Sequence, residues 1–285
     1  MIDKFKAFIK ERHSIYLRRA AGDPRPWTED ILLREYKFTN IYRELDRTTI
    51  WCKNNVRDKD WGSERNRALS IFAFRFFNRI ATCDAVFNTG AWKIFLDTNS
   101  TAPMERMVKH HRKNKAIATG AYIIKTVNGL DKLSGIIWSI KAGVPTIDTL
   151  IAEKPQTLAH AQQILLHAPY LGSFMAAQLV ADMKYTPLLA NATDWHTWAA
   201  PGPGSRRGLN LLCGRPLENN WNEEEWLDAL QILREAKLVP MFKELGWEIP
   251  HAQDVQNMLC EFSKYHRGFC RNKFTPSAKD ENMYS

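Results

Sequence analysis

The sequence of 285 residues lacks any long apolar run. A membrane-spanning helix needs ~20 consecutive apolar residues, and no segment comes near that length. The N-terminal stretch MIDKFKAFIKERHSIYLRR alternates charged with apolar residues, unlike the continuous apolar segment of a secretory signal. We therefore expect a soluble, intracellular, cytoplasmic protein with no membrane partner.

Paired cysteines are also missing. The five cysteines are scattered and form no CxxC, so they predict reduced thiols rather than a disulfide framework. Cys260, His266 and Cys270 are grouped too loosely to make a good zinc site. The sequence therefore predicts no metal site.

Several common catalytic signatures are absent. The chain contains no GxxxxGK[ST] phosphate loop, no GxSxG and no HExxH, which argues against a P-loop kinase, an α/β-hydrolase and a zinc protease of that type. Gly202, Gly204 and Gly208 form GxGxxxG with no strand pattern before them, so they are not a dinucleotide-binding fingerprint.

Positive charge is in excess. Lys and Arg number 40 against 31 Asp and Glu, which gives a formal net charge of +9. A basic chain of this size favours a polyanionic partner, most often a nucleic acid.

Helical periodicity dominates the sequence, whereas strand-like alternation is nearly absent. Apolar residues recur at three- and four-residue steps over residues 3–19, 64–82, 223–238 and 253–266. Glycine and proline interrupt the pattern between these segments. We predict an all-α protein of about ten to twelve helices.

The domain prediction is one all-α domain over residues 1–285. A division into two lobes, 1–100 and 101–270, would fall in the stretch DTNSTAP at 97–103. Residues 271–285 form a polar C-terminal tail.

The stretch 165–196 predicts two helices joined by a tight turn. The first helix ends near Leu166 and the second opens at the end of the turn, whose residues we predict to bind DNA: Pro169, Tyr170, Leu171, Gly172 and Ser173. Backbone N–H groups at the start of the second helix can hold a DNA phosphate without reading sequence. Asp194 follows the turn; the alternative is a purely structural hairpin with Asp194 as a helix N-cap.

Arginines and aromatic residues are interleaved over residues 11–51. Arginine forks bind phosphate oxygens in pairs, and aromatic faces stack on bases. The candidate phosphate-binding arginines are Arg18, Arg19, Arg43 and Arg47. Arg43 and Arg47 are predicted to share one helix face, and Asp46 beside them is expected to orient an arginine. The alternative is a set of solvated faces and internal salt bridges.

The stretch 199–214, AAPGPGSRRGLNLLCG, predicts a second anion site. Pro201 to Gly204 form an exposed turn, and a helix is expected to begin at Ser205. Its N-terminus and the adjacent guanidinium groups suit a phosphate or pyrophosphate. The candidate residues are Gly202, Gly204, Ser205, Arg206 and Arg207. The alternative is a glycine-rich turn with exposed arginines.

The hairpin resembles that of the helix-hairpin-helix DNA glycosylases. The matching residues are Leu166, Pro169, Gly172, Ala176, Asp194 and His196, although Tyr170 stands where the family has its first glycine. The resemblance implies a helix-hairpin-helix, glycosylase-like helical bundle in which Asp194 is the catalytic carboxylate.

Over residues 11–267 the chain resembles the phage amino acid:DNA transferases, also called α-glutamyl/putrescinyl-thymine pyrophosphorylases. These are related to the helical domain of 5-hydroxymethyluracil DNA kinases. The residues that match are Arg18, Arg19, Gly22, Pro26, Trp27, Thr28, Asp30, Asn40, Arg43, Asp46, Arg47, Gly202, Pro203, Gly204, Arg206, Gly208, Leu259, Cys260, Glu261, Lys264 and Tyr265.

The resemblance implies an enzyme that replaces the phosphate or pyrophosphate of phosphorylated 5-hydroxymethyluracil in double-stranded DNA with glycine, glutamate or putrescine. Asp194 would stabilise the cationic ring or deprotonate the amine, and the base would be flipped out. Candidates to stack on it are Trp27, Trp195, His196 and Trp198. Asn40, Asp46, Lys264 and Tyr265 are further family-motif residues.

No cofactor is expected, apart from Mg²⁺ that could accompany the pyrophosphate. The compartment implied is the cytoplasm of an infected bacterium. Two alternatives stay open: a monofunctional DNA glycosylase, and a DNA-binding module without catalysis.

Overall fold

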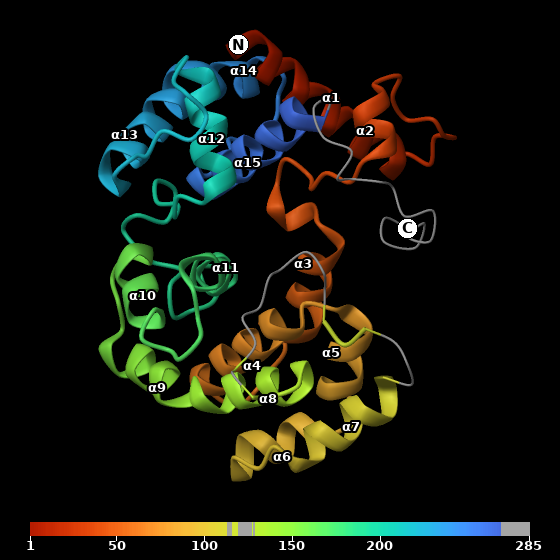
Figure 1. Cartoon of the computed structure of the whole chain (residues 1–285), viewed down its shortest axis with the longest axis vertical. Coiled ribbons are helices and arrows are strands. Elements are labelled where there is room, and N and C mark those ends of the chain that lie inside the picture. The colour runs from red at the N-terminus through yellow and green to blue at the C-terminus, as the bar shows by residue number, and fades with distance from the viewer. Residues whose placement is uncertain (113–115, 119–126, 128, 269–285) are drawn as a thin grey trace. The chain divides into compact units, whose positions relative to one another are not determined.

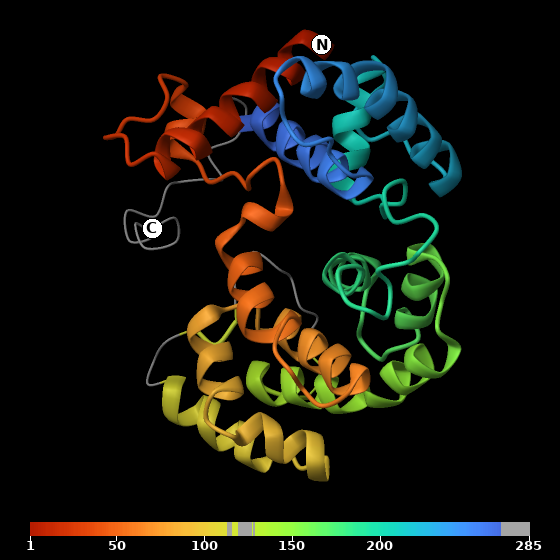
Figure 2. The same ribbon diagram turned by 180° about the vertical axis from the view of Figure 1, so that it is seen from behind.

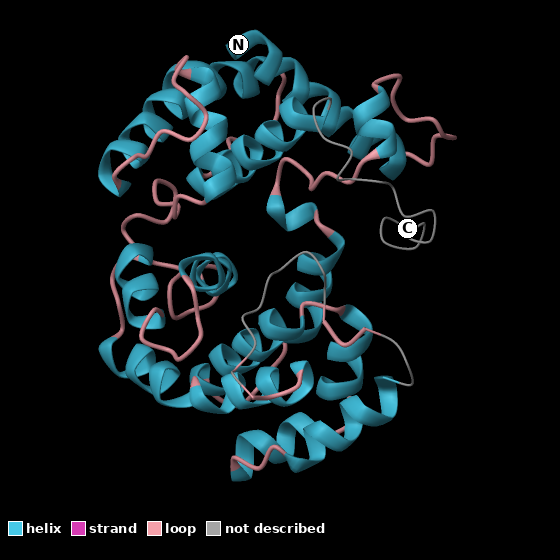
Figure 3. Ribbon diagram, viewed as in Figure 1, coloured by secondary structure: helices cyan, strands magenta, loops and turns pink. Residues whose placement is uncertain are grey.

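The computed structural model describes residues 1–112, 116–118, 127 and 129–268, and throughout them it contains helices and no strand (Figures 1 and 3). The predicted all-α class is therefore confirmed. The predicted polar tail, 271–285, lies outside the described residues. Within the described ranges, no helix combines the length and apolar character that crossing a membrane requires.

The chain divides into two units. Unit 1 joins residues 1–47 to residues 196–285, and unit 2 is the single segment 48–195. The sequence placed a lobe boundary at 97–103 instead. In the structure those residues lie inside unit 2, where they connect two neighbouring helices.

Unit 1 is built from both ends of the chain. Its elements are α1 (Ile2–Ala20), α2 (Ile31–Glu35), the 3₁₀ turn η1 (Arg43–Leu45), α12 (Pro203–Leu212), α13 (Glu223–Leu233), the π-helical turn η3 (Arg234–Leu238), α14 (Val239–Glu244) and α15 (Ala252–Gly268). Helices α1 and α15 lie side by side in both views (Figures 1 and 2), and the rings of Phe5 and Phe262 meet at 5.0 Å. The core is a continuous set of buried apolar side chains, most of them from α1, α13, α14 and α15.

The helices of unit 1 form where their sequences favour them. Asn222 caps α13 by accepting a hydrogen bond from the Glu225 amide, and three glutamates fill the first turn, where the helix dipole stabilises negative charge. The predicted helices 3–19, 223–238 and 253–266 correspond to α1, α13 with η3, and α15.

Unit 2 contains the remaining elements. They are α3 (Arg47–Cys52, whose first residue ends unit 1), the π-helical turn η2 (Lys53–Arg57), α4 (Glu64–Phe77), α5 (Ile80–Phe87), α6 (Ala91–Thr98), α7 (Ala102–Arg112), α8 (Lys132–Ala142), α9 (Val144–Glu153), α10 (Leu158–Leu165) and α11 (Ser173–Met183). Helix α4 packs against α8, α9 and α11, and its residues from Ala68 to Phe77 are all buried.

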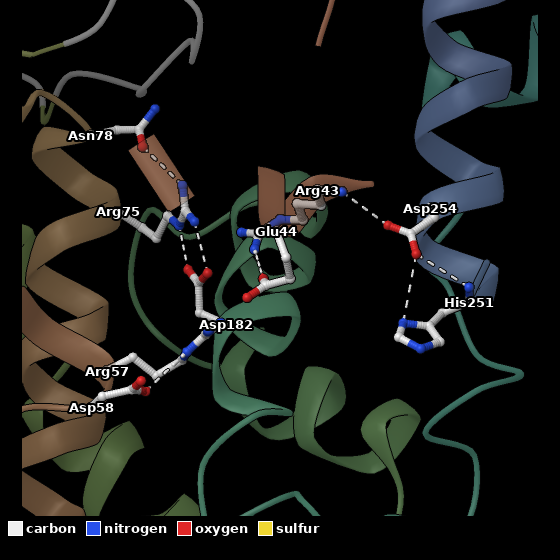
Figure 4. A network of polar contacts seen from close by, with 9 residues as sticks. All are labelled: Arg43, Glu44, Arg57, Asp58, Arg75, Asn78, Asp182, His251 and Asp254. Atoms are coloured by element: carbon white, nitrogen blue, oxygen red, sulfur yellow. Dashed lines mark hydrogen bonds and ion pairs between the residues drawn. The ribbon is translucent and has the colours of Figure 1, made fainter. Parts of the chain in front are cut away.

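The predicted helix 64–82 is interrupted. Asn78 ends α4 in the left-handed conformation at φ +42°, and α5 begins at Ile80. Arg75 and Asp182, both buried, form a two-pronged ion pair between α4 and α11; one of its hydrogen bonds measures 2.7 Å. Asn78 accepts another hydrogen bond from Arg75 at 2.9 Å (Figure 4). Any movement of α4 relative to α11 that separates this pair would leave a buried charge without its partner, which is costly. The pair therefore fixes the position of one helix against the other.

Candidate functional site

The predicted hairpin lies where the sequence placed it. Helix α10 ends at Leu165, and α11 begins at Ser173 after the turn that carries Pro169 to Gly172. Tyr170 adopts φ +61°, the left-handed region that favours glycine, at the position where glycosylase hairpins carry one. The predicted turn between the two helices is therefore present, and its left-handed position holds a tyrosine instead of a glycine.

The hairpin turn presents aromatic rings and backbone donors. Tyr170 is 40% exposed and Phe174 is 46% exposed, and the Tyr170 ring meets the edge of Trp138 at 5.5 Å. Gly172 provides no side chain to cap α11. Leu171 anchors the turn, because its side chain is buried and its amide donates to the carbonyl of Ala168 at 3.2 Å.

Asp194 caps a helix. Its two carboxylate oxygens accept hydrogen bonds from the amides of Leu158, at 2.6 Å, and Ala159, at 3.1 Å, at the start of α10. Thr157 caps the same helix by accepting from the His160 amide at 3.0 Å. The capping role that the sequence left as an alternative is therefore present, but for α10 and not for the helix that follows Asp194.

The aromatic residues after Asp194 have different surroundings. The indole N–H of Trp195 donates to the carbonyl of Lys184 at 2.7 Å, and the buried Lys184 ammonium donates back to the Trp195 carbonyl at 2.9 Å. The same ammonium lies 3.8 Å from the centroid of the Trp195 ring. Lys184 was not among the predicted site residues, because nothing in the sequence around it marks it as a buried lysine.

The other three stacking candidates belong to unit 1. Trp198 is buried, so its ring is part of the core rather than a free stacking surface. His196 is exposed and meets the ring of His251 at 5.1 Å. Trp27 is partly exposed, and the Arg25 guanidinium lies 4.6 Å from the centroid of its ring.

The glycine–arginine segment is helical earlier than predicted. Helix α12 begins at Pro203, not at Ser205, and Gly202 is its N-cap. The buried Ser205 hydroxyl accepts a hydrogen bond from the Gly202 amide at 3.0 Å. The turn therefore ends at Gly202, and Gly204 lies inside the helix.

Two glycines of this segment serve helix packing. A Cβ on Gly208 would lie 2.2 Å from the Leu259 carbonyl oxygen, and one on Gly204 would lie 2.4 Å from Sγ of Cys260. Only glycine lets α12 approach α15 this closely. The two glycines thus allow close contact between two motifs of the family resemblance, the glycine–arginine segment on α12 and the segment with Leu259 and Cys260 on α15.

The arginines of this segment have partners within unit 1. The Arg206 guanidinium donates to the carbonyl of Trp221. Arg207 forms an ion pair with Glu218 at 2.9 Å, and the Glu218 side chain is 75% exposed. Because an exposed ion pair contributes only ~0–1 kcal/mol, Arg207 can exchange Glu218 for another anion at little cost.

Arg43 and Arg47 do not share a helix face, contrary to the prediction. Arg43 lies in η1, Asp46 is extended at ψ +133°, and Arg47 begins the separate helix α3. The Arg43 amide donates to Asp254 at 3.1 Å, and its guanidinium lies 3.6 Å from Glu44 (Figure 4). The extended residue between the two helices breaks the 3.6-residue period that the prediction assumed.

The other two arginines lie near the end of α1. Arg18 pairs with Glu11 at 3.1 Å and donates to the carbonyl of Trp27. The Arg19 guanidinium lies 5.8 Å from the centroid of the Tyr16 ring.

Helix α15 holds the segment 30–46 in place. The Lys264 ammonium donates to the carbonyl of Lys37 at 2.6 Å, and the Tyr265 hydroxyl donates to the Asp30 carboxylate at 2.5 Å. This contact and burial raise the pKa of Tyr265 to about 12. Lys264 and Tyr265, both predicted motif residues, thus hold a second motif, the segment 30–46, against α15.

Asp46 is bonded to an asparagine, whereas the sequence predicted that it orients an arginine. Its Oδ1 accepts from the backbone amide of Asn40 at 2.9 Å and from the side-chain amide at 3.1 Å. Burial raises the pKa of Asp46 from its usual 3.8 to about 6; nearby Glu261 also raises it, while Arg43 and Arg12 lower it. A carboxyl that titrates near neutral pH is suited to proton transfer.

A metal centre finds no support in the described part of the chain, where no three His, Cys, Asp or Glu side chains gather as ligands. Cys270, one of the loosely grouped zinc candidates, lies outside the described residues.

Comparison with known proteins identifies relatives. The family model described as "5-hmdU DNA kinase, helical domain" matches residues 1–273. A "5-hmdU DNA kinase" of Bacillus phage SP10 is 24% identical over 232 residues, which cover 74% of this chain and 36% of that protein. The chain thus spans about a third of the length of this relative. No solved structure matches.

Proposed function

The chain belongs to the family of 5-hmdU DNA kinase helical domains, and from this membership we propose that it modifies thymine-derived bases in phage DNA. The observation that carries the proposal is the family match over residues 1–273.

The reaction we infer is substitution at the 5-methylene carbon of phosphorylated 5-hydroxymethyluracil. The C–O bond to the phosphate or pyrophosphate breaks, and a C–N bond to glycine, glutamate or putrescine forms. The uracil ring donates electrons from N1 to expel the leaving group, which leaves a cationic ring, and the attacking ammonium gives up a proton. The protein must bind an anion, hold a carboxylate near the ring and accept that proton.

The start of α12 is our candidate for the leaving group. Gly204 and Ser205 bring backbone N–H groups to the helix N-terminus that Gly202 caps, and Arg206 and Arg207 add charge. The weak, exposed pair between Arg207 and Glu218 supports the proposal, because it leaves that guanidinium available to an incoming phosphate. Mg²⁺ could accompany the pyrophosphate, and no other cofactor is proposed.

Double-stranded DNA is the proposed macromolecular partner. The hairpin turn from Pro169 to Ser173 would hold a phosphate through backbone N–H groups at the start of α11, where Gly172 provides no side-chain cap. Arg18, Arg19, Arg43 and Arg47 would contact further phosphates. The target base must leave the stack to react, and Trp27, Trp195 or His196 would face it.

Asp194 remains our proposed stabiliser of the cationic ring. Its carboxylate already bonds two amides of α10, so it would act through its charge while it stays in the cap. An ion held by backbone donors is positioned before the reaction begins, which is what electrostatic stabilisation requires.

Nucleoside mass spectrometry tests the proposed reaction. The full chain is incubated with duplex DNA that contains 5-phosphomethyl- or 5-pyrophosphomethyl-uracil, together with each amine in turn. The expected product is a nucleoside in which the amine replaces the phosphate and the glycosidic bond is intact. Abasic sites would instead identify a glycosylase, and unchanged bases with DNA binding would identify a non-catalytic module.

A further inference from the structure

Asp46 is held by one oxygen only. Both hydrogen bonds from Asn40 reach Oδ1, and within the described part of the chain no donor contacts Oδ2. Asn40 is itself fixed, because its side-chain amide also donates to the carbonyl of Leu45 at 2.8 Å. The carboxyl group is therefore aligned through Oδ1, and none of the described donors bonds its second oxygen.

The segment that carries Asp46 is rigidly supported within unit 1. Arg12 of α1 donates to the carbonyls of Phe38, at 2.8 Å, and Thr39, at 3.1 Å. Asn257 of α15 donates to the Thr39 hydroxyl at 2.9 Å. Such anchoring from two helices holds a reactive group in place without using the group itself.

The charges around Asp46 come from three elements. Arg12 on α1 and Arg43 in η1 favour the carboxylate form, while Glu261 on α15 opposes it. Arg12 bonds two backbone carbonyls, and Glu261 is paired with Lys264 at 2.5 Å. Burial outweighs the Asn40 hydrogen bond and the two guanidinium groups, and a cationic ligand beside Oδ2 would favour the carboxylate form further.

We propose that Oδ2 of Asp46 binds the primary ammonium group of the amine co-substrate and accepts its proton. This inference rests on the proposed function, since it assigns a residue to the nucleophile of that reaction. One N–H bond of the ammonium breaks, and its proton goes to the carboxylate. The ring expels the phosphate as the C–O bond breaks, and the freed lone pair then forms the C–N bond at the methylene carbon. The second ammonium proton of the adduct passes to water.

The test compares Asp46→Asn with Asp30→Asn in the full chain. Asparagine keeps the Oδ1 acceptor for Asn40 and removes the base. With glycine, glutamate or putrescine, the Asp46 variant should turn over about a hundredfold or more slowly, since general-base help contributes 10²–10⁴. With an O-alkylhydroxylamine, which is unprotonated at neutral pH, the loss should be under about threefold. Asp30 accepts a hydrogen bond from Tyr265 and caps α2, so it has a structural role. Any loss of turnover in its variant should therefore be the same with the amines as with the O-alkylhydroxylamine.

The pH profile gives a second readout. Wild-type turnover should rise as the pH passes about 6, where the Asp46 carboxyl ionises, and the Asn variant should lack this rise. Equal losses with both kinds of nucleophile, or an unchanged profile, would overturn the assignment and leave the proposed function intact.

A binding measurement separates the two ideas without chemistry. Calorimetry with glycine or putrescine should show affinity that falls about tenfold or more in Asp46→Asn, because a charge-assisted hydrogen bond contributes ~1.5–3 kcal/mol. If wild-type protein binds the amine through Asp46 yet forms no product, the proposed reaction fails and the ammonium site stands. Equal binding by wild type and the Asp46 variant would refute the site.

Discussion

Two carboxylates of this chain have opposite surroundings. Asp194 is satisfied on both oxygens by amides of α10. Asp46 is bonded through one oxygen only, and burial raises its pKa to about 6. The first arrangement holds a carboxylate in a fixed position, whereas the second favours a group that gains and loses a proton. Two acidic residues would thus serve two roles, one electrostatic and one in proton transfer.

The titration of Asp46 should also appear in stability. Its pKa is higher in the folded state than the usual 3.8, so between pH 4 and 6 the folded protein binds more protons and stability falls as the pH rises. Asparagine does not ionise, so the variant does not lose this stability. The unfolding free energy of Asp46→Asn minus that of wild type should therefore increase by about 1–2 kcal/mol between pH 4 and pH 7.5. Urea unfolding at both values checks this. A variant that is destabilised equally at both would show that Asp46 holds the fold.

Asp194→Asn separates a capping role from a catalytic one. Asparagine can accept only one of the two amide hydrogen bonds, so the variant should lose about 1–2 kcal/mol of stability. If the charge also stabilises the ring cation, turnover should fall about a hundredfold or more. Thr157→Ala is the matched control, because it weakens the same cap without touching Asp194. Comparable turnover losses in the two variants would reduce Asp194 to a cap.

Arg207→Ala tests the leaving-group site. Loss of one charged contact to the departing phosphate should cost about 2–4 kcal/mol, roughly thirty- to several-hundredfold in turnover. Affinity for unphosphorylated DNA should change much less. Glu218→Ala removes the exposed partner of Arg207 and should leave turnover near wild type. Parallel losses of turnover and DNA affinity in Arg207→Ala would reassign the residue to the DNA backbone.

At the scale of elements, α12 and α15 depend on glycine. Gly208→Ala would place a Cβ 2.2 Å from backbone, so we expect a loss of at least ~3 kcal/mol of unfolding free energy. Gly202→Ala is the control, since its Cβ would meet only a side chain at 3.5 Å and should cost under about 1 kcal/mol. Thermal denaturation measures both. A Gly208 variant as stable as the control would show that the helices can move apart.

Local patterns predicted the elements but not all of their roles. The periodicity of residues 3–19 and the turn at Pro169 correspond to α1 and the hairpin. Gly202 and Gly204 were assigned to a ligand from composition, yet Gly204, like Gly208, packs against α15. A contact between segments 50 residues apart leaves no periodic signal in either, so only the structure shows it.

At the scale of the whole molecule, the division into units escaped prediction for the same reason. Unit 1 joins the first 47 residues to those after 195, and such long-range pairing is invisible to a search for linkers. The sites divide accordingly: Asp46 and the start of α12 belong to unit 1, while the hairpin and Asp194 belong to unit 2. The motifs of the family resemblance identified the segments, though not which of them pack together.

The net charge of +9 predicts a salt-dependent interaction with DNA. If about four to six phosphates are neutralised, affinity for duplex DNA should fall roughly a hundred- to thousandfold between 50 and 200 mM salt. Fluorescence anisotropy with unmodified duplexes of different sequence should show the same slope for each, because backbone contacts carry no sequence information. An affinity that does not change with salt would show that the basic residues do not bind the DNA phosphates.

The most direct test of the proposed function measures the transfer of ¹⁵N from the amine to the DNA base. Duplex DNA with 5-pyrophosphomethyl-uracil is incubated with the protein and ¹⁵N-labelled glycine, glutamate or putrescine, and its nucleosides are then analysed by mass spectrometry. The account predicts that ¹⁵N appears on the methylene carbon of the nucleoside, with one pyrophosphate released per label and no abasic sites. Pyrophosphate-bearing nucleosides recovered unchanged with every amine, or free base released in their place, would contradict it.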